Sequence, residues 1–223
     1  MTNKFSSLSQ FDETLIHRNN KDFYIAKIDE ALFRRINGKS YKPYCTLPTE
    51  DLRYLHLLYK DIDGFEHEGE MICNAYIVAD LIDIFQKLYK NNYPIEKIRL
   101  IDEYNADDET SMRDNNSSCF NFRYISHTTK ISKHGLGLAV DINPLYNPYV
   151  KCVDGKQIIE PATAKKYLDR TKDFPYKTDK NSLVYKLFAA HGFEWGGDWE
   201  TRKDYQHFEL PTAVIETLYK ENK

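Results

Sequence analysis

Hydrophobic and polar positions along the chain predict a mixture of helices and short strands. Apolar residues recur at helical spacing over residues 75–90, which predicts a long amphipathic helix ended by Asn91, Asn92 and Pro94. Other segments with helical spacing or helix end signals are residues 29–38, 48–59, 163–169, 182–191 and 212–220. Strand-like segments are residues 23–28, 97–103, 119–125, 137–143 and 205–210. Helices before, between and after a few strands favour an α+β fold over a regular βαβ alternation.

The segment GLAVDIN, residues 137–143, has two different faces if it is a strand. Leu138, Val140 and Ile142 fall on one face, whereas Asp141 shares the other face with small or polar residues. A carboxylate between neighbours with almost no side chain has room beside it for a ligand or a metal ion. His134 precedes this strand through a turn that contains two glycines. An isolated His and Asp at this spacing is common by chance, so a surface histidine and a turn aspartate are the alternative.

A second histidine and carboxylate pair lies near the C-terminus, in the segment WGGDWETRKDYQHFEL. If HFEL is a strand, His207 and Glu209 share one face, and the apolar residues between and after them face the core. Two histidines and one aspartate supply the three protein ligands of a catalytic zinc, which leaves a fourth position for water. Asp204 is then the candidate general base, with Glu209 the next candidate.

Composition narrows the classes of partner. The 223 residues carry a formal net charge of −3, so the chain has no broad basic field for a nucleic-acid backbone. No apolar run approaches the ~18 residues of a membrane span, and the first residues lack the pattern of a signal peptide. An exported protein would have had such a signal removed. The four cysteines are far apart without a CxxC pair, and we expect small buried side chains, although two disulfides are possible.

The two motifs together resemble a known family. Ser132-x-His134-x-x-Gly137-x-Ala139-x-Asp141, followed by Asp204-x-x-His207, is similar to the zinc peptidases that include VanY-like D-alanyl-D-alanine carboxypeptidases and L-alanyl-D-glutamate endopeptidases. The resemblance implies that His134, Asp141 and His207 bind Zn²⁺ and that Asp204 is the base. It also implies a Hedgehog/DD-peptidase-like α+β fold, in which a small antiparallel sheet is surrounded by helices.

The family resemblance also implies a domain organisation and a substrate. We expect residues 1–223 to form a single zinc peptidase domain, in which about residues 1–60 are an N-terminal extension packed on a catalytic core of about residues 68–210. The implied substrates are peptidoglycan stem peptides. An enzyme of the cell wall would act in the periplasm or outside the cell if exported, and would otherwise stay in the cytoplasm until release.

The chain departs from the family pattern in two places. The arginine that often follows an early strand in the family is missing, and Arg123, on the same strand face as Asn121, is the best substitute, with Arg113 second. A surface arginine paired with the acidic residues at 107–109 is the alternative. Carboxypeptidase members tend to have Glu where this chain has Asp204, which favours an endopeptidase.

The remaining site predictions concern substrate contacts and a function of another class. Ser132, Asn121 and Trp199 are candidate substrate-binding residues, although an aromatic residue beside a double glycine also packs over a turn in many proteins. A fold of this type can also bind zinc without catalysis, as a cell-wall-binding or signalling module. Asp204 argues against that second class, because such a module does not need a base.

Overall fold

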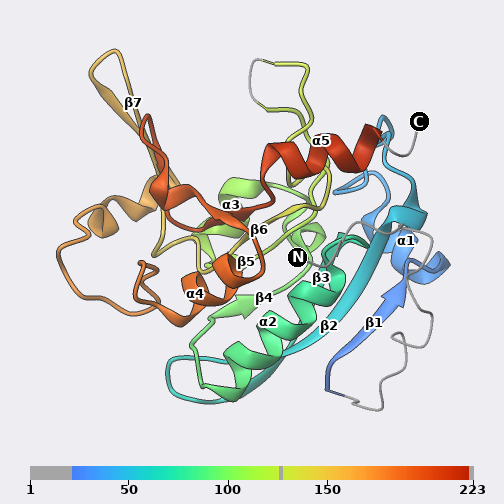
Figure 1. Ribbon diagram of the computed structural model, residues 1–223, viewed down its shortest axis with the longest axis horizontal. Helices are drawn as coiled ribbons and strands as arrows, with labels where there is room; N and C mark the ends of the chain where they lie inside the picture. The colour runs from blue at the N-terminus through green and yellow to red at the C-terminus, as the bar shows by residue number, and fades with distance from the viewer. Residues whose placement is uncertain (1–21, 126–127, 221–223) are drawn as a thin grey trace.

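The computed structural model describes residues 22–125 and 128–220 of the chain (Figure 1). The helices are α1 Glu30–Ile36, α2 Val78–Lys90, α3 Asp108–Arg113, α4 Leu183–Ala190 and α5 Thr212–Lys220. The strands are β1 Tyr24–Lys27, β2 Leu52–Lys60, β3 Glu66–Asn74, β4 Lys97–Ile98, β5 Asn116–Ser117, β6 Ala139–Asp141, β7 Tyr149–Val153, β8 Lys156–Glu160, β9 Glu194–Trp195, β10 Lys203–Asp204 and β11 His207–Glu209. Short 3₁₀ helices cover Thr49–Asp51, Ile101–Tyr104, Ala162–Tyr167 and Gly196–Asp198.

The two longest strands, β2 and β3, form an antiparallel sheet with β1 in the order β1-β2-β3, and α2 lies along it (Figure 1). The apolar stripe of α2 packs against residues of β2 and β3, so the amphipathic pattern of the sequence faces this sheet. The same core continues to α4, β6, β11 and α5. One continuous hydrophobic core therefore joins the first sheet to the strands that carry the candidate ligands.

The candidate ligands lie on a second antiparallel sheet, in the order β6-β11-β9. Val140 of β6 lies opposite Phe208 of β11, and both are completely or almost completely buried. Phe208 stacks on Phe188 of α4 with a centroid distance of 4.3 Å. These contacts fix the buried face of the sheet and leave the other face for polar side chains.

A third sheet, in the order β10-β7-β8, flanks the second. Asp204 of β10 lies opposite Tyr149 of β7. The β7–β8 hairpin projects from the body of the molecule in Figure 1, and most of its side chains are exposed. The base of this hairpin therefore lies beside the candidate base Asp204.

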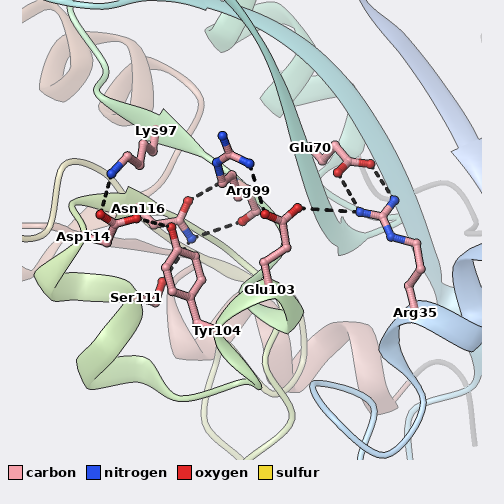
Figure 2. Close-up of polar contacts among 9 residues, drawn as sticks. All are labelled: Arg35, Glu70, Lys97, Arg99, Glu103, Tyr104, Ser111, Asp114 and Asn116. Atoms are coloured by element: carbon pink, nitrogen blue, oxygen red, sulfur yellow. Dashed lines mark hydrogen bonds and ion pairs between the residues drawn. The ribbon is translucent and has the colours of Figure 1, made fainter.

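Polar contacts hold α1, β3, α3 and the small parallel pair β4-β5 together (Figure 2). Arg35 of α1 makes a bidentate contact with Glu70 of β3, with both N–O distances 2.7 Å. Glu103 lies between Arg35 and Arg99, and Asn116 bonds to the backbone of Arg99 in both directions. The network ties the first helix to the segment that leads to α3.

The mixed helices and small sheets confirm the predicted α+β class, but several short sheets replace the single sheet expected. The predicted helix at residues 48–59 is wrong, because this segment is a 3₁₀ turn followed by β2. The strands predicted at 97–103 and 119–125 are wrong in extent: only residues 97–98 of the first belong to a named strand, and none of the second does. The predicted helix at 163–169 is 3₁₀ rather than α.

The expected N-terminal extension lies partly outside the described residues, which begin at position 22. From residue 22 onwards it contributes β1, α1 and β2, and β2 pairs with β3 along its full length. All four cysteines are free; Cys73 and Cys119 are buried as expected, whereas Cys152 is exposed. None of the helices in the described residues is both long and apolar enough to span a bilayer.

Candidate metal centre

Three predicted ligands converge because of strand register. Asp141 of β6 and His207 of β11 are directly opposite each other in the antiparallel pair, where side chains on one face approach closely. His134 comes from the turn that precedes β6, and its carbonyl accepts a hydrogen bond from the Asn121 amide. The side chains are mostly buried, with 8% of each histidine and 15% of Asp141 exposed.

The distances within this triad fit a zinc ion. Nε2 of His134 lies 3.1 Å from Nδ1 of His207 and 3.2 Å from Oδ2 of Asp141. Nδ1 of His207 lies 3.0 Å from Oδ1 of Asp141. Ligands at about 2.0–2.1 Å from a tetrahedral zinc are separated by roughly 3.3 Å. The donor set and its spacing therefore suit Zn²⁺, and these three residues could hold it.

The outer nitrogen of each histidine has an acceptor. Nδ1 of His134 donates to the Cys119 carbonyl oxygen at 2.7 Å, so Nε2 is left to face the triad. Nε2 of His207 donates to Glu209 at 2.9 Å, and Glu209 pairs with Lys133 at 2.9 Å. Such outer hydrogen bonds fix the ring orientation and the protonation of metal-binding histidines.

The charges of the triad shift one another's protonation. Burial by itself raises the pKa of Asp141, but His134 and His207 lower it well below its ordinary value. Burial by itself lowers the pKa of His207, but the hydrogen bonds to Asp141 and Glu209 overcome this effect and raise it to about 10. In the metal-free protein His207 is therefore a cation that donates from both nitrogens. Metal binding would displace the Nδ1 proton and leave the Nε2 proton on His207, where it is donated to Glu209.

Asp204 lies beside the triad without belonging to it. Its Oδ1 atom is buried and has no hydrogen-bond partner among the described residues. Burial is the largest cause that raises the pKa of Asp204 to about 7; His207 opposes the rise and Asp141 adds to it. A carboxyl group with a pKa near neutrality is suited to accept a proton at physiological pH.

Two glycines allow these close approaches. A Cβ atom on Gly196 would lie 2.6 Å from the carbonyl oxygen and 2.7 Å from the Cβ of Asp204. Gly137 has a φ of +66°, and a Cβ atom there would lie 2.7 Å from the Asn74 amide nitrogen. The Asn74 amide donates to the Gly137 carbonyl oxygen at 2.9 Å. The glycines therefore bring Asp204 and the end of β3 close to the site.

The predicted arginine and its neighbours form a separate polar cluster. Nε of Arg123 lies 2.6 Å from Oδ2 of Asp108, and the Asn121 side chain donates to Oδ1 of the same residue at 2.9 Å. Arg113 pairs with Glu109 at 2.8 Å. Arg123 therefore pairs with the acidic residues at 107–109, which is the alternative that the sequence left open. A contact between Arg123 and the substrate stays a prediction.

Two other predicted substrate residues, Ser132 and Trp199, lie near ligands of the triad, Ser132 along the chain and Trp199 in space. Ser132 is buried, and its hydroxyl accepts a hydrogen bond from the Gly135 amide at 3.2 Å within the turn that carries His134. The Trp199 ring lies 5.4 Å from the His207 ring, measured between centroids, and the Arg202 guanidinium lies over Trp199 at 4.3 Å.

The sequence analysis missed Lys133, and it treated Glu209 as an alternative base rather than as the hydrogen-bond acceptor of His207. The spacing of two residues between His207 and Glu209 could have indicated this contact, because it places both side chains on one face of a strand. No sequence pattern indicates the role of Lys133, because Lys133 and Glu209 are far apart in the sequence and only the tertiary fold brings them together.

Comparison with known proteins agrees with this geometry. Residues 126–210 match the family model described as D-alanyl-D-alanine carboxypeptidase. No solved structure gives a significant match to the chain. The matched segment contains the whole triad together with Asp204 and Trp199, whereas Asn121 and Arg123 precede it. The match over the segment that builds the metal site identifies the chain as a peptidase, a zinc-dependent hydrolase.

Proposed function

We propose that the chain is a D-alanyl-D-alanine carboxypeptidase that removes the terminal residue of peptidoglycan stem peptides. The observation that carries the proposal is the pairing of a three-ligand cluster with a buried carboxyl oxygen that has no partner among the described residues. The description of the matching family supports the choice of substrate.

The proposed chemistry is hydrolysis of an amide bond. Zinc, held by His134, Asp141 and His207, would supply Lewis-acid polarisation of the carbonyl and would lower the pKa of water. Asp204 would accept a proton at Oδ1 from the attacking water and later deliver it to the leaving amine. Glu209 and Lys133 would keep the His207 ring oriented while charge develops in the site.

A second candidate is an L-alanyl-D-glutamate endopeptidase that acts on the same stem peptides. The observation that favours it is the aspartate at position 204, where the resemblance associates glutamate with carboxypeptidases. Both candidates use the same triad and the same base. A non-catalytic zinc module of the cell wall is the remaining alternative, and the unpartnered carboxyl oxygen of Asp204 gives it no support.

The proposal is tested by incubating the zinc-loaded protein with purified muropeptides and identifying the products by mass spectrometry. Loss of one terminal alanine supports the carboxypeptidase, and release of the peptide after its first residue supports the endopeptidase. Asp204→Asn keeps the shape of the side chain and removes its basicity, so it should retain zinc while the hydrolysis rate falls by about 10²–10⁴-fold. If Asp204→Asn loses zinc instead, Asp204 is a ligand; if it keeps the full rate, the base is another residue. Intact muropeptides after incubation with wild-type protein would favour the non-catalytic module.

A further inference from the structure

Arg202 differs from the other exposed arginines that the structure describes. Those arginines each face a carboxylate: Arg34 pairs with Glu30, Arg35 with Glu70, Arg99 with Glu103, Arg113 with Glu109, and Arg123 with Asp108. Arg202 forms no ion pair within residues 22–125 and 128–220, and its guanidinium lies instead over the Trp199 ring at 4.3 Å. The adjacent acidic residue Asp198 is already paired with Lys180 at 2.7 Å.

Arg202 lies near the metal centre, because both Arg202 and His207 contact the Trp199 ring. Trp199 contacts Arg202 and also lies near His207, with 5.4 Å between the centroids of the Trp199 and His207 rings. Two ring contacts in series bring the guanidinium within about 10 Å of the His207 ring. Burial raises the pKa of Tyr149, and the Arg202 charge opposes that rise, so Arg202 also acts on the residue opposite Asp204 in the β7–β10 pair.

Stacking leaves the binding edge of the guanidinium free. The N–H groups of a guanidinium lie in its own plane, and the edge that does not contact the aromatic ring can bind a carboxylate in a bidentate contact. The aromatic face also holds the side chain in one orientation, which lowers the entropy lost when a ligand binds. Arg202 is therefore an exposed, preoriented carboxylate receptor close to the site.

We propose that Arg202 binds the α-carboxylate of the residue that follows the scissile bond. This inference rests on the proposed peptidase function of the same site. A residue spans about 3.3–3.6 Å of extended chain, so a carboxylate one residue beyond a carbonyl at the triad is within reach of a cation roughly 10 Å away. Both candidate substrates have such a group: the terminal carboxylate of D-alanyl-D-alanine, and the free α-carboxylate of a D-glutamate linked through its side chain.

The test uses two pairs of synthetic peptides. One pair is an acylated L-lysyl-D-alanyl-D-alanine with a free or an amidated C-terminus. The other pair contains the L-alanyl-D-glutamyl bond with the D-glutamate α-carboxyl group free or amidated. The pair that the wild-type protein hydrolyses identifies the source of the carboxylate. For that pair we expect kcat/KM to favour the free carboxylate by at least tenfold.

Arg202→Gln should reduce this preference to near one, mainly by raising KM for the free carboxylate, while the zinc content stays unchanged. Arg202→Lys keeps the charge without the planar guanidinium, so its preference should fall between those of the wild type and Arg202→Gln. Arg34→Gln is the matched control, because it makes the same substitution at an exposed arginine of α1, and it should behave as wild type. An Arg202→Gln protein that keeps the wild-type preference overturns the inference.

The inference and the proposed function fail differently. If the wild-type protein hydrolyses peptides without any preference for the free carboxylate, the inference fails and the peptidase proposal stands. If neither pair is hydrolysed, the peptidase proposal fails, and binding of the four peptides to the zinc-loaded protein then decides the inference. Tryptophan fluorescence, to which Trp199 contributes, reports that binding, and equal dissociation constants for the free and the amidated peptides would overturn the inference.

Discussion

Replacing Glu209 with glutamine tests whether the support behind His207 sets the zinc affinity. Glu209 accepts the Nε2 proton of His207 at 2.9 Å and pairs with Lys133 at 2.9 Å. Both partners of the ion pair are largely buried, with 12% of Glu209 and 18% of Lys133 exposed. Glutamine has the same shape, so the substitution removes the charge without opening a cavity.

The expected loss follows from this geometry. Removing an outer partner of a metal ligand costs about 10–100-fold in metal affinity, which is about 1.4–2.7 kcal/mol. We expect the upper end at Glu209, because its hydrogen bond is charged and shielded from water. The glutamine amide can also turn its NH₂ group toward Nε2, which would place the His207 proton on Nδ1, the nitrogen that faces the triad. The dissociation constant for zinc should therefore rise about 100-fold.

Competition with a chromogenic zinc chelator measures this constant directly, without reference to any substrate. Glu70→Gln is the control, because Glu70 also forms an ion pair with a basic side chain, that of Arg35, but lies on β3 in a different polar network. Zinc affinity within twofold of wild type in Glu209→Gln would refute the reasoning. An equal loss in Glu70→Gln would assign the effect to general destabilisation.

Three further predictions follow from the structure. Metal analysis should find one zinc in the wild-type protein and none in His134→Ala or His207→Ala, and stoichiometric zinc in either variant would contradict the proposed ligand set. Gly196→Ala should keep zinc but lower the rate of hydrolysis at least tenfold, because the added Cβ would displace Asp204. Complete loss of a general base lowers a rate by about 10²–10⁴-fold, and a displaced base should lose part of that contribution. The hydrogen bond to Arg35 lowers the pKa of Glu70, so the pair stabilises the fold above the unfolded pKa of about 4.3 and loses this effect as the pH falls through the folded pKa. Urea unfolding should show Glu70→Gln less stable than wild type by about 1 kcal/mol at pH 7, with the difference closing as the pH falls through the lowered pKa of Glu70.

The local chemistry of the site could be predicted from sequence because it depends on strand parity. The alternation in residues 137–143 and 207–210 determined which side chains point to the core, and Leu138, Val140, Ile142, Phe208 and Leu210 are all buried as expected. His207 and Glu209 share the opposite face, and they contact each other. Period-two alternation is a property of the backbone, so it needs no knowledge of the tertiary fold.

The first half of the chain was harder to predict because its pattern fits two structures. In residues 52–59 almost every position is buried in the structure, since β2 packs on both faces and pairs with β1 and β3. A continuous apolar run satisfies helical spacing and strand alternation equally well. Only the partner strands, which supply the hydrogen bonds, decide between them, and they lie elsewhere in the sequence.

Contacts between distant segments account for the rest of the difference. Lys133 reaches Glu209, and Arg123 reaches Asp108, through approaches that no local pattern encodes. The alternative for Arg123, pairing with the acidic stretch, depended on charge alone and agrees with the structure. Charge complementarity can therefore suggest a partner for a side chain, but the position of that pair relative to the site comes from the fold.

The metal centre is coupled to the fold through the register of one strand pair. Asp141 faces His207 because β6 and β11 pair with Val140 opposite Phe208 in the core. A shift of this register by one residue would turn Asp141 toward the core and expose the apolar residues of β6. Burial of Phe208 against Phe188 of α4 opposes such a shift. Phe208→Ala should therefore lower the free energy of unfolding by about 3–5 kcal/mol and should also lower the zinc affinity. If chelator competition shows unchanged zinc affinity in a destabilised Phe208→Ala protein, the triad is held by its own hydrogen bonds rather than by the packing of β11.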